Sequence, residues 1–375
     1  MKNIKILITI LLVGIFIGTA CVPKKTPVQP TAVPATEESY PPPEVVAPTA
    51  ESYPAPAPQA VTSAGYPEPE DIVITPANAP LVLSESAHYT PGFYGIPKWC
   101  TDQTCIMIIG FDDLLVISYP GFDEIFKYHA EANEPILDAS SSGKNYLTTR
   151  DFKELVIQNW ETSARKTIQV DPGFMDVKFS PDGKQILITS PDEWKAQVYD
   201  VETGSLIATL TGFETAAPVY DLRYGQNNQF AVWIARATVQ VSDIATNQIY
   251  PAIFHEDFVM AMDINAQGTM LATAAAANVN DEFLPTIFLF DIKTGETIKQ
   301  FTVEGGLFDL KFSPDGNQIA CSFGNDVKLY DLEGVQQPVS FVAFSGNASR
   351  VLFSPDGTIL MVSDDDSNLH FFNLK

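Results

Sequence analysis

The sequence has few of the side chains from which catalytic and metal centres are usually built. Its 375 residues include four histidines, and these are widely spaced, at His88, His129, His255 and His370. There is no Gly-x-Ser-x-Gly motif, no His-Glu-x-x-His motif and no glycine-rich phosphate loop. The sequence therefore predicts no catalytic residues, no metal ligands and no cofactor.

Basic residues are also scarce. Lys and Arg number 22 against 46 Asp and Glu, so the formal net charge is −24. Because a negative protein surface repels the phosphate backbone of a nucleic acid, this composition argues against nucleic-acid binding. The possible ligands are then metal cations, basic proteins and neutral glycans. The alternative is that the acidity serves only to keep the protein soluble.

No apolar run reaches the approximately 20 residues that a membrane-spanning helix needs. The apolar run Ile6–Ile17 follows two lysines and precedes small residues and Cys21. This pattern resembles a bacterial lipoprotein signal over residues 1–20, in which Cys21 would receive the lipid. Gly18 stands where such signals usually place Leu. Ordinary cleavage with secretion and an uncleaved anchor are the two alternatives.

Residues 21–75 have almost no large apolar side chains and are rich in Pro, Ala, Thr, Glu and Val. Such a segment cannot bury enough apolar surface to fold, so we expect a disordered linker. A Tyr-Pro pair recurs every 13 residues, at Tyr40, Tyr53 and Tyr66. We interpret the segment as a semi-rigid spacer that reaches on the order of 150 Å when fully extended. Docking of a partner to the Tyr-Pro pairs is the alternative.

The rest of the chain is repetitive. Phe-Ser-Pro-Asp-Gly begins at Phe179, Phe312 and Phe353, and each copy is followed by a short apolar run and an aromatic-Asp or aromatic-Asn pair. Four degenerate versions of this turn lie in register with these copies and begin at Trp99, Ala139, Tyr224 and Ile264. The seven turns are 40, 40, 45, 40, 48 and 41 residues apart. A repeat of about 40 residues, made of short strands and tight turns, is typical of a propeller blade.

This repeat resembles the WD40 type of seven-bladed β-propeller, over residues 76–375. The resemblance implies an all-β fold of four-stranded antiparallel blades. Two features depart from the family, since no Gly-His pair precedes the first strand of a blade and the Trp-Asp pair is replaced by pairs such as Tyr199-Asp200 and Phe290-Asp291. We therefore expect an incomplete polar network and stability that comes mainly from apolar packing between blades. A related bacterial propeller family without that network fits equally well.

We expect the last blade to lack its outer strand unless another segment supplies one, because the sequence ends just after the predicted third strand of that blade. The apolar run Pro80–Ser84 lies just before the first blade. We predict that this N-terminal strand pairs with Asn368–Phe372 and closes the ring, which removes an unpaired sheet edge.

The cysteines of the propeller differ in context. Cys100 and Cys105 bracket a four-residue turn of the first blade, where they can face each other at disulfide distance. An oxidising exterior would preserve that bond, and two reduced core thiols are the alternative. Cys321 stands alone in a predicted strand, where a small buried apolar residue is expected.

The densest group of oxygen ligands is Asp364-Asp365-Asp366-Ser367-Asn368. It resembles the first half of a calcium loop, but the following Gly and the distant Glu are missing. We therefore predict a polar turn that leads into the next strand.

The best candidate for partner contact is the loop between the second and third strands of the fifth blade, Ala274–Pro285. It is the longest insertion and carries Asp281, Phe283 and Leu284. In propellers such loops share one face, and Trp194 in the third blade is expected there too. The alternative is that Phe283 and Leu284 fold back over their own blade.

These features predict an extracytoplasmic, non-catalytic propeller that is anchored to the membrane by its lipid, on the outer face of the cytoplasmic membrane or in the periplasm. It would bind a protein or glycan partner or act as a scaffold. A propeller enzyme of the lactonase or lyase type and a structural subunit of a cell-envelope assembly are the alternatives. Converging carboxylates in a central cavity would favour the enzyme, and a large apolar outer rim would favour the assembly.

Overall fold

The computed structural model describes residues 81–83, 85–142, 144–150, 154–170, 174, 176–190, 195–211, 221–225, 228–279, 282–324, 326–337, 339–341 and 347–374. The predicted signal, residues 1–20, and the linker, residues 21–75 with Cys21, lie outside this part of the chain. Within it, no helix is long and apolar enough to cross a membrane.

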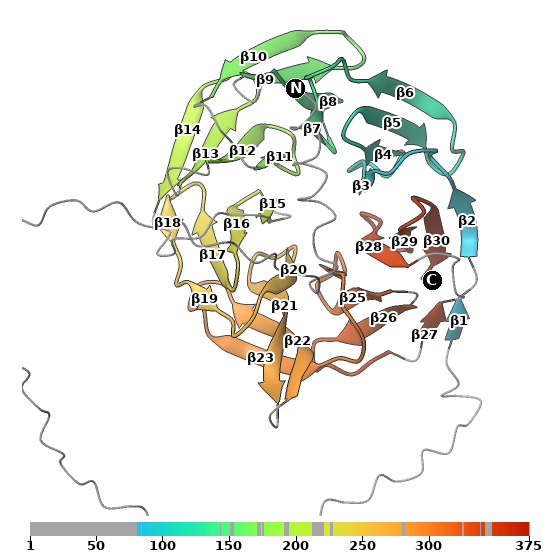
Figure 1. The fold of residues 1–375 in the computed structure, drawn as a ribbon, viewed down its shortest axis with the longest axis vertical. Coiled ribbons are helices and arrows are strands. Elements are labelled where there is room, and N and C mark those ends of the chain that lie inside the picture. Colours follow the sequence, from blue (N-terminus) through green and yellow to red (C-terminus); the bar gives the residue numbers. More distant parts are fainter. Residues whose placement is uncertain are drawn as a thin grey trace, which may run out of the picture. The chain divides into compact units, whose positions relative to one another are not determined.

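The described chain is all β, and seven of its sheets are arranged as the blades of a ring (Figure 1). An eighth, two-stranded sheet pairs β1 (Leu81–Leu83) with β27 (Val339–Phe341). We call the four strand positions of a blade a to d, from the centre outward. Blades one and two contain β3 (Ile96–Trp99), β4 (Cys105–Ile109), β5 (Asp113–Ser118), β6 (Glu124–His129), β7 (Ile136–Ala139), β8 (Asn145–Arg150), β9 (Glu154–Asn159) and β10 (Arg165–Gln169). Blades three and four contain β11 (Asp176–Phe179), β12 (Gln185–Ser190), β13 (Lys195–Asp200), β14 (Leu206–Thr211), β15 (Asp221–Tyr224), β16 (Phe230–Ala235), β17 (Thr238–Asp243), β18 (Gln248–Ile249) and β19 (Ile253–Phe254).

Blades five and six contain β20 (Val259–Ile264), β21 (Met270–Val279), β22 (Glu282–Asp291), β23 (Thr297–Thr302), β24 (Asp309–Phe312), β25 (Gln318–Phe323), β26 (Asp326–Asp331) and β27 (Val339–Phe341). Blade seven contains β28 (Ala348–Phe353), β29 (Ile359–Asp364), β30 (Leu369–Asn373) and the N-terminal β2 (Glu85–Tyr89). The predicted seven-bladed all-β propeller is confirmed.

Strand a of every blade ends at the residue with which the predicted turn begins. These seven strand ends are Trp99, Ala139, Phe179, Tyr224, Ile264, Phe312 and Phe353. The turn is built by its own side chains: Ser180 Oγ donates to Asp182 Oδ1 (2.7 Å) and accepts from the backbone N–H of Gln185 (2.9 Å). Gly183 follows with a φ of +71°, which a side chain disfavours. The same contacts recur in the turns at Ser313 and Ser354.

The aromatic-Asp pairs end strand c and form the following turn. In three blades the carboxylate that ends strand c accepts a hydrogen bond from the backbone N–H three residues later, in the pairs Asp200 with Thr203 (2.7 Å), Asp243, which follows Ser242, with Thr246 (2.9 Å), and Asp291 with Thr294 (2.8 Å). These bonds favour the charged carboxylate and lower the pKa of Asp200 and Asp291. The second member of the pair is therefore explained by turn formation, in the manner of an Asx-turn.

The core consists of seven apolar clusters among the described residues, and each cluster lies between two neighbouring blades. Between blades three and four, for example, Leu187 and Val198 pack with Leu222 and Trp233, and all four are fully buried. Burial of apolar surface at every blade interface agrees with the expected source of stability.

An N-terminal strand closes the ring, but it is not the predicted one. β2 (Glu85–Tyr89) is the segment that pairs with β30, antiparallel, and Figure 1 shows it at the rim of blade seven. The predicted pairing of Pro80–Ser84 with Asn368–Phe372 is wrong, because β1 (Leu81–Leu83) instead runs parallel to β27 at the outer edge of blade six. β2 was less apparent in the sequence because only its alternate residues Ala87 and Tyr89 face the core.

Candidate functional site

One face of the ring carries most of the exposed apolar side chains. Because the strands of a blade alternate in direction, the b–c turns and the connections from strand d to the next strand a lie on the same face. Of thirteen exposed large apolar residues in the described chain, seven lie in these connections or at the beginning of a strand beside them: Tyr94, Ile96, Phe111, Phe258, Met260, Phe283 and Phe308. We call this surface the apolar face.

The blade-five segment of this face is a hairpin and not the predicted loop. β21 and β22 are paired over residues 274–279 and 282–285, so that Asn278 lies opposite Phe283 and Ala277 lies opposite Leu284. The extended hairpin is visible at the lower edge of Figure 1. The run of alanines in β21 has low strand propensity. Pairing with β22 outweighs that propensity.

The hairpin exposes one of the predicted contact residues. The side chain of Phe283 is 60% exposed, whereas Leu284 is half-buried. The predicted contact residues Asp281 and Trp194 lie outside the described residues.

The connection from blade four to blade five is held against this hairpin. The backbone N–H of Asn278 donates to Glu256 Oε2 (2.8 Å), and His255 Nε2 lies 3.1 Å from Thr273 Oγ1. The His255 ring also lies edge-on to Phe288. Burial lowers the pKa of His255 to about 4, so the imidazole is neutral at physiological pH.

Two apolar side chains of this connection reach solvent beside the hairpin. The register of β20 shifts between Val259 and Ala261, which leaves Met260 as an unpaired bulge residue that is 50% exposed. Phe258 is 52% exposed, and the Arg236 guanidinium lies 5.3 Å from its ring centre. Three large exposed apolar side chains therefore belong to blade five, namely Phe258, Met260 and Phe283.

A second group of functional candidates lines the innermost strands. It contains five acidic and five basic residues: Asp138, Asp176, Asp221, Asp263, Asp309, Lys98, Lys178, Arg223, Lys311 and Arg350. Each carboxylate lies within 4.0 Å of a cationic side chain, as in Asp138 with Lys98 (3.1 Å) and Asp263 with Lys311 (3.2 Å). Burial would raise the pKa of Asp221, but the cations nearby outweigh it and lower that pKa.

Three of these carboxylates bind one blade to the next. Asp138 Oδ2 accepts from the backbone N–H of Phe179 (2.7 Å), and Asp263 Oδ2 accepts from that of Phe312 (3.0 Å). Asp309 Oδ2 accepts from the N–H of Val351 at 3.3 Å. These carboxylates therefore join adjacent strands a and neutralise cations. That arrangement suits ring assembly better than general acid-base chemistry.

Sequence reasoning missed this inner charged ring, although a signal for it was present. A charged residue directly precedes six of the seven predicted turns, namely Lys98, Asp138, Lys178, Arg223, Asp263 and Lys311. A charged side chain at a fixed offset in a repeat indicates a shared structural role.

A cavity of the described chain lies away from the inner charged residues. It has a volume of about 550 Å³, opens between blades three and four, and is lined by residues that include Ile207, Asn228, Ile244 and Asn247. Its lining contains no charged side chain, cysteine or histidine, so the converging carboxylates do not open into it.

The remaining candidate residues from the sequence have structural roles. Cys100 and Cys105 are joined by a disulfide with their Cα atoms 5.2 Å apart. Cys321 is fully buried, and burial raises the pKa of its thiol. In the acidic turn, Asp364 Oδ1 accepts from the backbone N–H of Asn368 (2.8 Å), as the polar-turn interpretation requires.

Comparison with known proteins identifies one repeat. The model of the family described as WD domain, G-beta repeat, matches residues 295–331. This stretch spans strand d of blade five and strands a, b and c of blade six. No curated protein matches the chain. The matched repeat and the ring of seven blades together make the chain similar to WD40 propellers.

Proposed function

We propose that this protein is a membrane-anchored, extracytoplasmic scaffold that binds a protein partner through the apolar face. The observation that carries the proposal is the gathering of exposed Phe258, Met260 and Phe283 on blade five. Exposed apolar side chains on one face indicate an interaction surface more strongly than the same residues scattered singly. A WD40-like fold suits this role, because a rigid ring presents many loops to a partner.

The chemistry of the face favours a protein over a glycan. Phe and Met side chains have no polar group with which to orient a sugar, and they gain most from burial against another apolar surface. Arg236 and Glu256 lie beside them and can supply polar contacts at the edge. The net charge of −24 disfavours a nucleic acid as partner.

The proposed location outside the cytoplasm depends on the N-terminal sequence. Lipidation of Cys21 would anchor the chain, and residues 21–75 would act as a spacer between membrane and ring. The disulfide between Cys100 and Cys105 supports an oxidising compartment.

The alternatives have less support. An enzyme of the lactonase or lyase type would use the inner carboxylates, but these are paired with cations and backbone N–H groups. A purely structural subunit would need a continuous apolar rim. The exposed apolar residues of the rim belong to strand d of different blades and are Ile125, Leu206, Ile207, Phe254 and Ile298.

The test is affinity capture from membrane extracts with the full chain as bait. A Phe258→Ser/Phe283→Ser variant is compared with an Ile298→Ser/Val335→Ser variant, whose targets are similarly exposed but lie on the rim and the opposite face. We expect the control to recover the same partner as the wild type and the first variant to lose it. Equal recovery by all three baits would contradict the proposal.

A further inference from the structure

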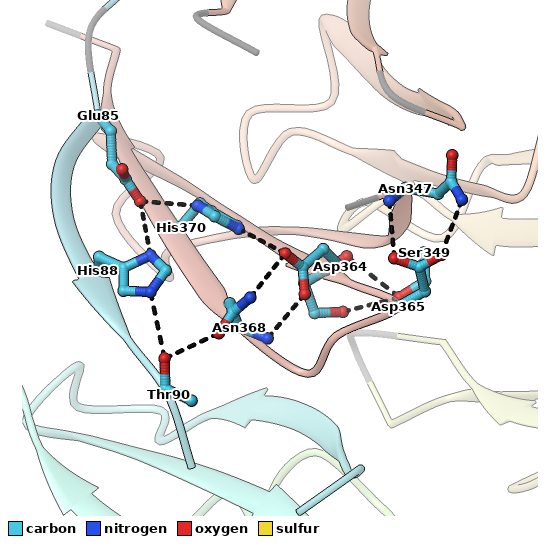
Figure 2. A network of polar contacts seen from close by, with 10 residues as sticks. Glu85, His88, Thr90, Asn347, Ser349, Asp364, Asp365, Asn368 and His370 are labelled. Atoms are coloured by element: carbon cyan, nitrogen blue, oxygen red, sulfur yellow. Dashed lines mark hydrogen bonds and ion pairs between the residues drawn. The ribbon is translucent and has the colours of Figure 1, made fainter. Parts of the chain in front are cut away.

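A cluster of metal-ligating side chains lies where the ring closes. Glu85 Oε1 is 2.7 Å from His370 Nδ1 and 3.2 Å from His88 Nδ1. One ligand atom from each residue lies within 4.8 Å of the others. Figure 2 shows both imidazoles pointing at the same carboxylate.

Strand geometry explains why these three side chains meet. His88 and His370 are direct partners across the β2–β30 pair, so they project from the same side of the sheet. Glu85 lies three residues before His88 and would normally point to the opposite side, because strand side chains alternate. The register shift between Glu85 and Ala87 adds one residue and reverses this relation, which brings Glu85 to the side of the histidines.

Further hydrogen bonds orient both rings. His370 Nε2 lies 3.0 Å from Asp364 Oδ2, and Asp364 is fully buried. His88 Nε2 lies 3.2 Å from Thr90 Oγ1. In Figure 2 the loop of contacts is completed by Asn368, which accepts from Thr90 (2.8 Å) and donates to Asp364 (2.9 Å). A carboxylate on the second nitrogen of a histidine is the usual support of a metal-bound imidazole.

We propose that Glu85, His88 and His370 form a binding site for a divalent transition-metal ion, and that Zn²⁺ is the ion that fits. Two imidazole nitrogens and one carboxylate oxygen are a common zinc donor set, with ligand distances of about 2.0–2.2 Å. Ca²⁺ and Mg²⁺ are disfavoured because they prefer all-oxygen ligands. The Glu85 and His88 side chains are 36% and 45% exposed, so they have room to move around an ion, and solvent can supply a fourth ligand.

The bound ion would join the two ends of the propeller. Glu85 and His370 are 285 positions apart in the sequence, and only the β2–β30 pair brings them together. An ion held by both strands stabilises the closed ring by binding the native state but not the unfolded chain. The proposal is independent of the partner-binding function, since the site lies at the seam of blade seven.

The test uses the full chain, freed of metal with a chelator, and titrates it with ZnCl₂ by calorimetry. The variants are Glu85→Gln and His88→Gln, because both residues are exposed while His370 is buried. The matched control is His129→Gln, whose Nδ1 also faces a carboxylate, Asp113, at 2.9 Å, but which belongs to no cluster of three ligands among the described residues. Thermal unfolding with and without Zn²⁺ is measured on the same four proteins.

We expect one Zn²⁺ per chain and a Zn²⁺-dependent rise in the unfolding temperature for the wild type and His129→Gln. Glu85→Gln and His88→Gln should bind at least tenfold more weakly and lose that rise. Co²⁺ absorption separates this site from binding at a free thiol, either Cys321 or a Cys21 that carries no lipid, because a thiolate ligand adds an intense charge-transfer band. No stoichiometric Zn²⁺, equal affinity in all four proteins, or a thiolate band that persists in His88→Gln would overturn the proposal.

Discussion

The two faces of the ring differ in how their turns are made. The a–b and c–d turns contain Ser, Asp and Gly, whose side chains and backbone satisfy one another, as at Ser180 and Asp182. The opposite face carries the exposed apolar side chains Phe258, Met260 and Phe283. The turns that form the repeat therefore contribute to the stability of the fold. The side chains of the apolar face contribute less to stability and are available for contact. Four substitutions test this difference, in order of decreasing effect on stability.

Gly334→Ala in a c–d turn should have the largest effect. Gly334 has a φ of +83°, and an added Cβ would lie 2.5 Å from Phe301 Cγ. We expect a loss of about 2–4 kcal/mol of unfolding free energy from strain and overpacking. The control is Gly306→Ala in a d–a connection, where nothing lies within 4 Å of the added atom. Equal chemical-denaturation midpoints for the two variants would contradict the comparison.

Acidification should next destabilise the protein through His255, on the apolar face. Its pKa is lowered to about 4 in the folded protein from 6.5, so the unfolded chain binds a proton at a higher pH than the native one. Stability should therefore fall as the pH drops from 6.5 to 4, by on the order of 2–3 kcal/mol. In His255→Gln this slope should become shallower, because carboxylates with a lowered pKa such as Asp200 and Asp291 still contribute to it. Urea unfolding at several pH values measures it, and an unchanged slope would argue against a buried neutral His255.

A smaller acid effect is expected on the opposite face from Asp356. Hydrogen bonds from the Thr358 backbone and from Ser354 and Thr358 side chains lower its pKa to about 2. The stabilisation is present above the unfolded pKa of 3.8 and is lost as the pH falls through about 2. Asp356→Asn should cost about 1 kcal/mol at neutral pH, by analogy with lost capping bonds. Thermal unfolding followed by circular dichroism should show that the difference in stability between Asp356→Asn and the wild type shrinks below pH 3.

Phe283→Ser should have the smallest effect on stability. The side chain is 60% exposed, and substitutions of such residues usually change stability by less than about 0.5 kcal/mol. Partner capture should fall while the unfolding temperature stays within a degree or two of the wild type. A large loss of stability would mean that Phe283 supports the hairpin and is not reserved for contact.

Local turn chemistry explains which parts of the fold were predictable. All seven strand-a ends coincide with predicted turn positions, because a tight turn needs specific residues within a few positions, as at Ser313 and Gly316. The blade-five hairpin and the closing strand were assigned incorrectly. Ala277 is a poor strand former that pairs because β22 lies beside it, and the strand pattern of β2 is interrupted by a register shift between Glu85 and Ala87.

The candidate sites were less predictable than the fold. Phe283 was identified because it is an apolar residue in an insertion, but Phe258 and Met260 gave no such signal. Met260 is exposed at a bulge in β20, and Phe258 lies in the connection just before that strand. The metal ligands His88 and His370 appeared unrelated in the sequence, because they lie at opposite ends of the propeller.

The sequence by itself determined the number of blades and the position of each turn, because the residues that form a turn are neighbours along the chain. Only the tertiary structure decided which strand closes the ring, which apolar side chains stay exposed, and that Glu85, His88 and His370 meet. Those outcomes depend on contacts between segments hundreds of residues apart, which are brought together by burial of apolar surface between blades.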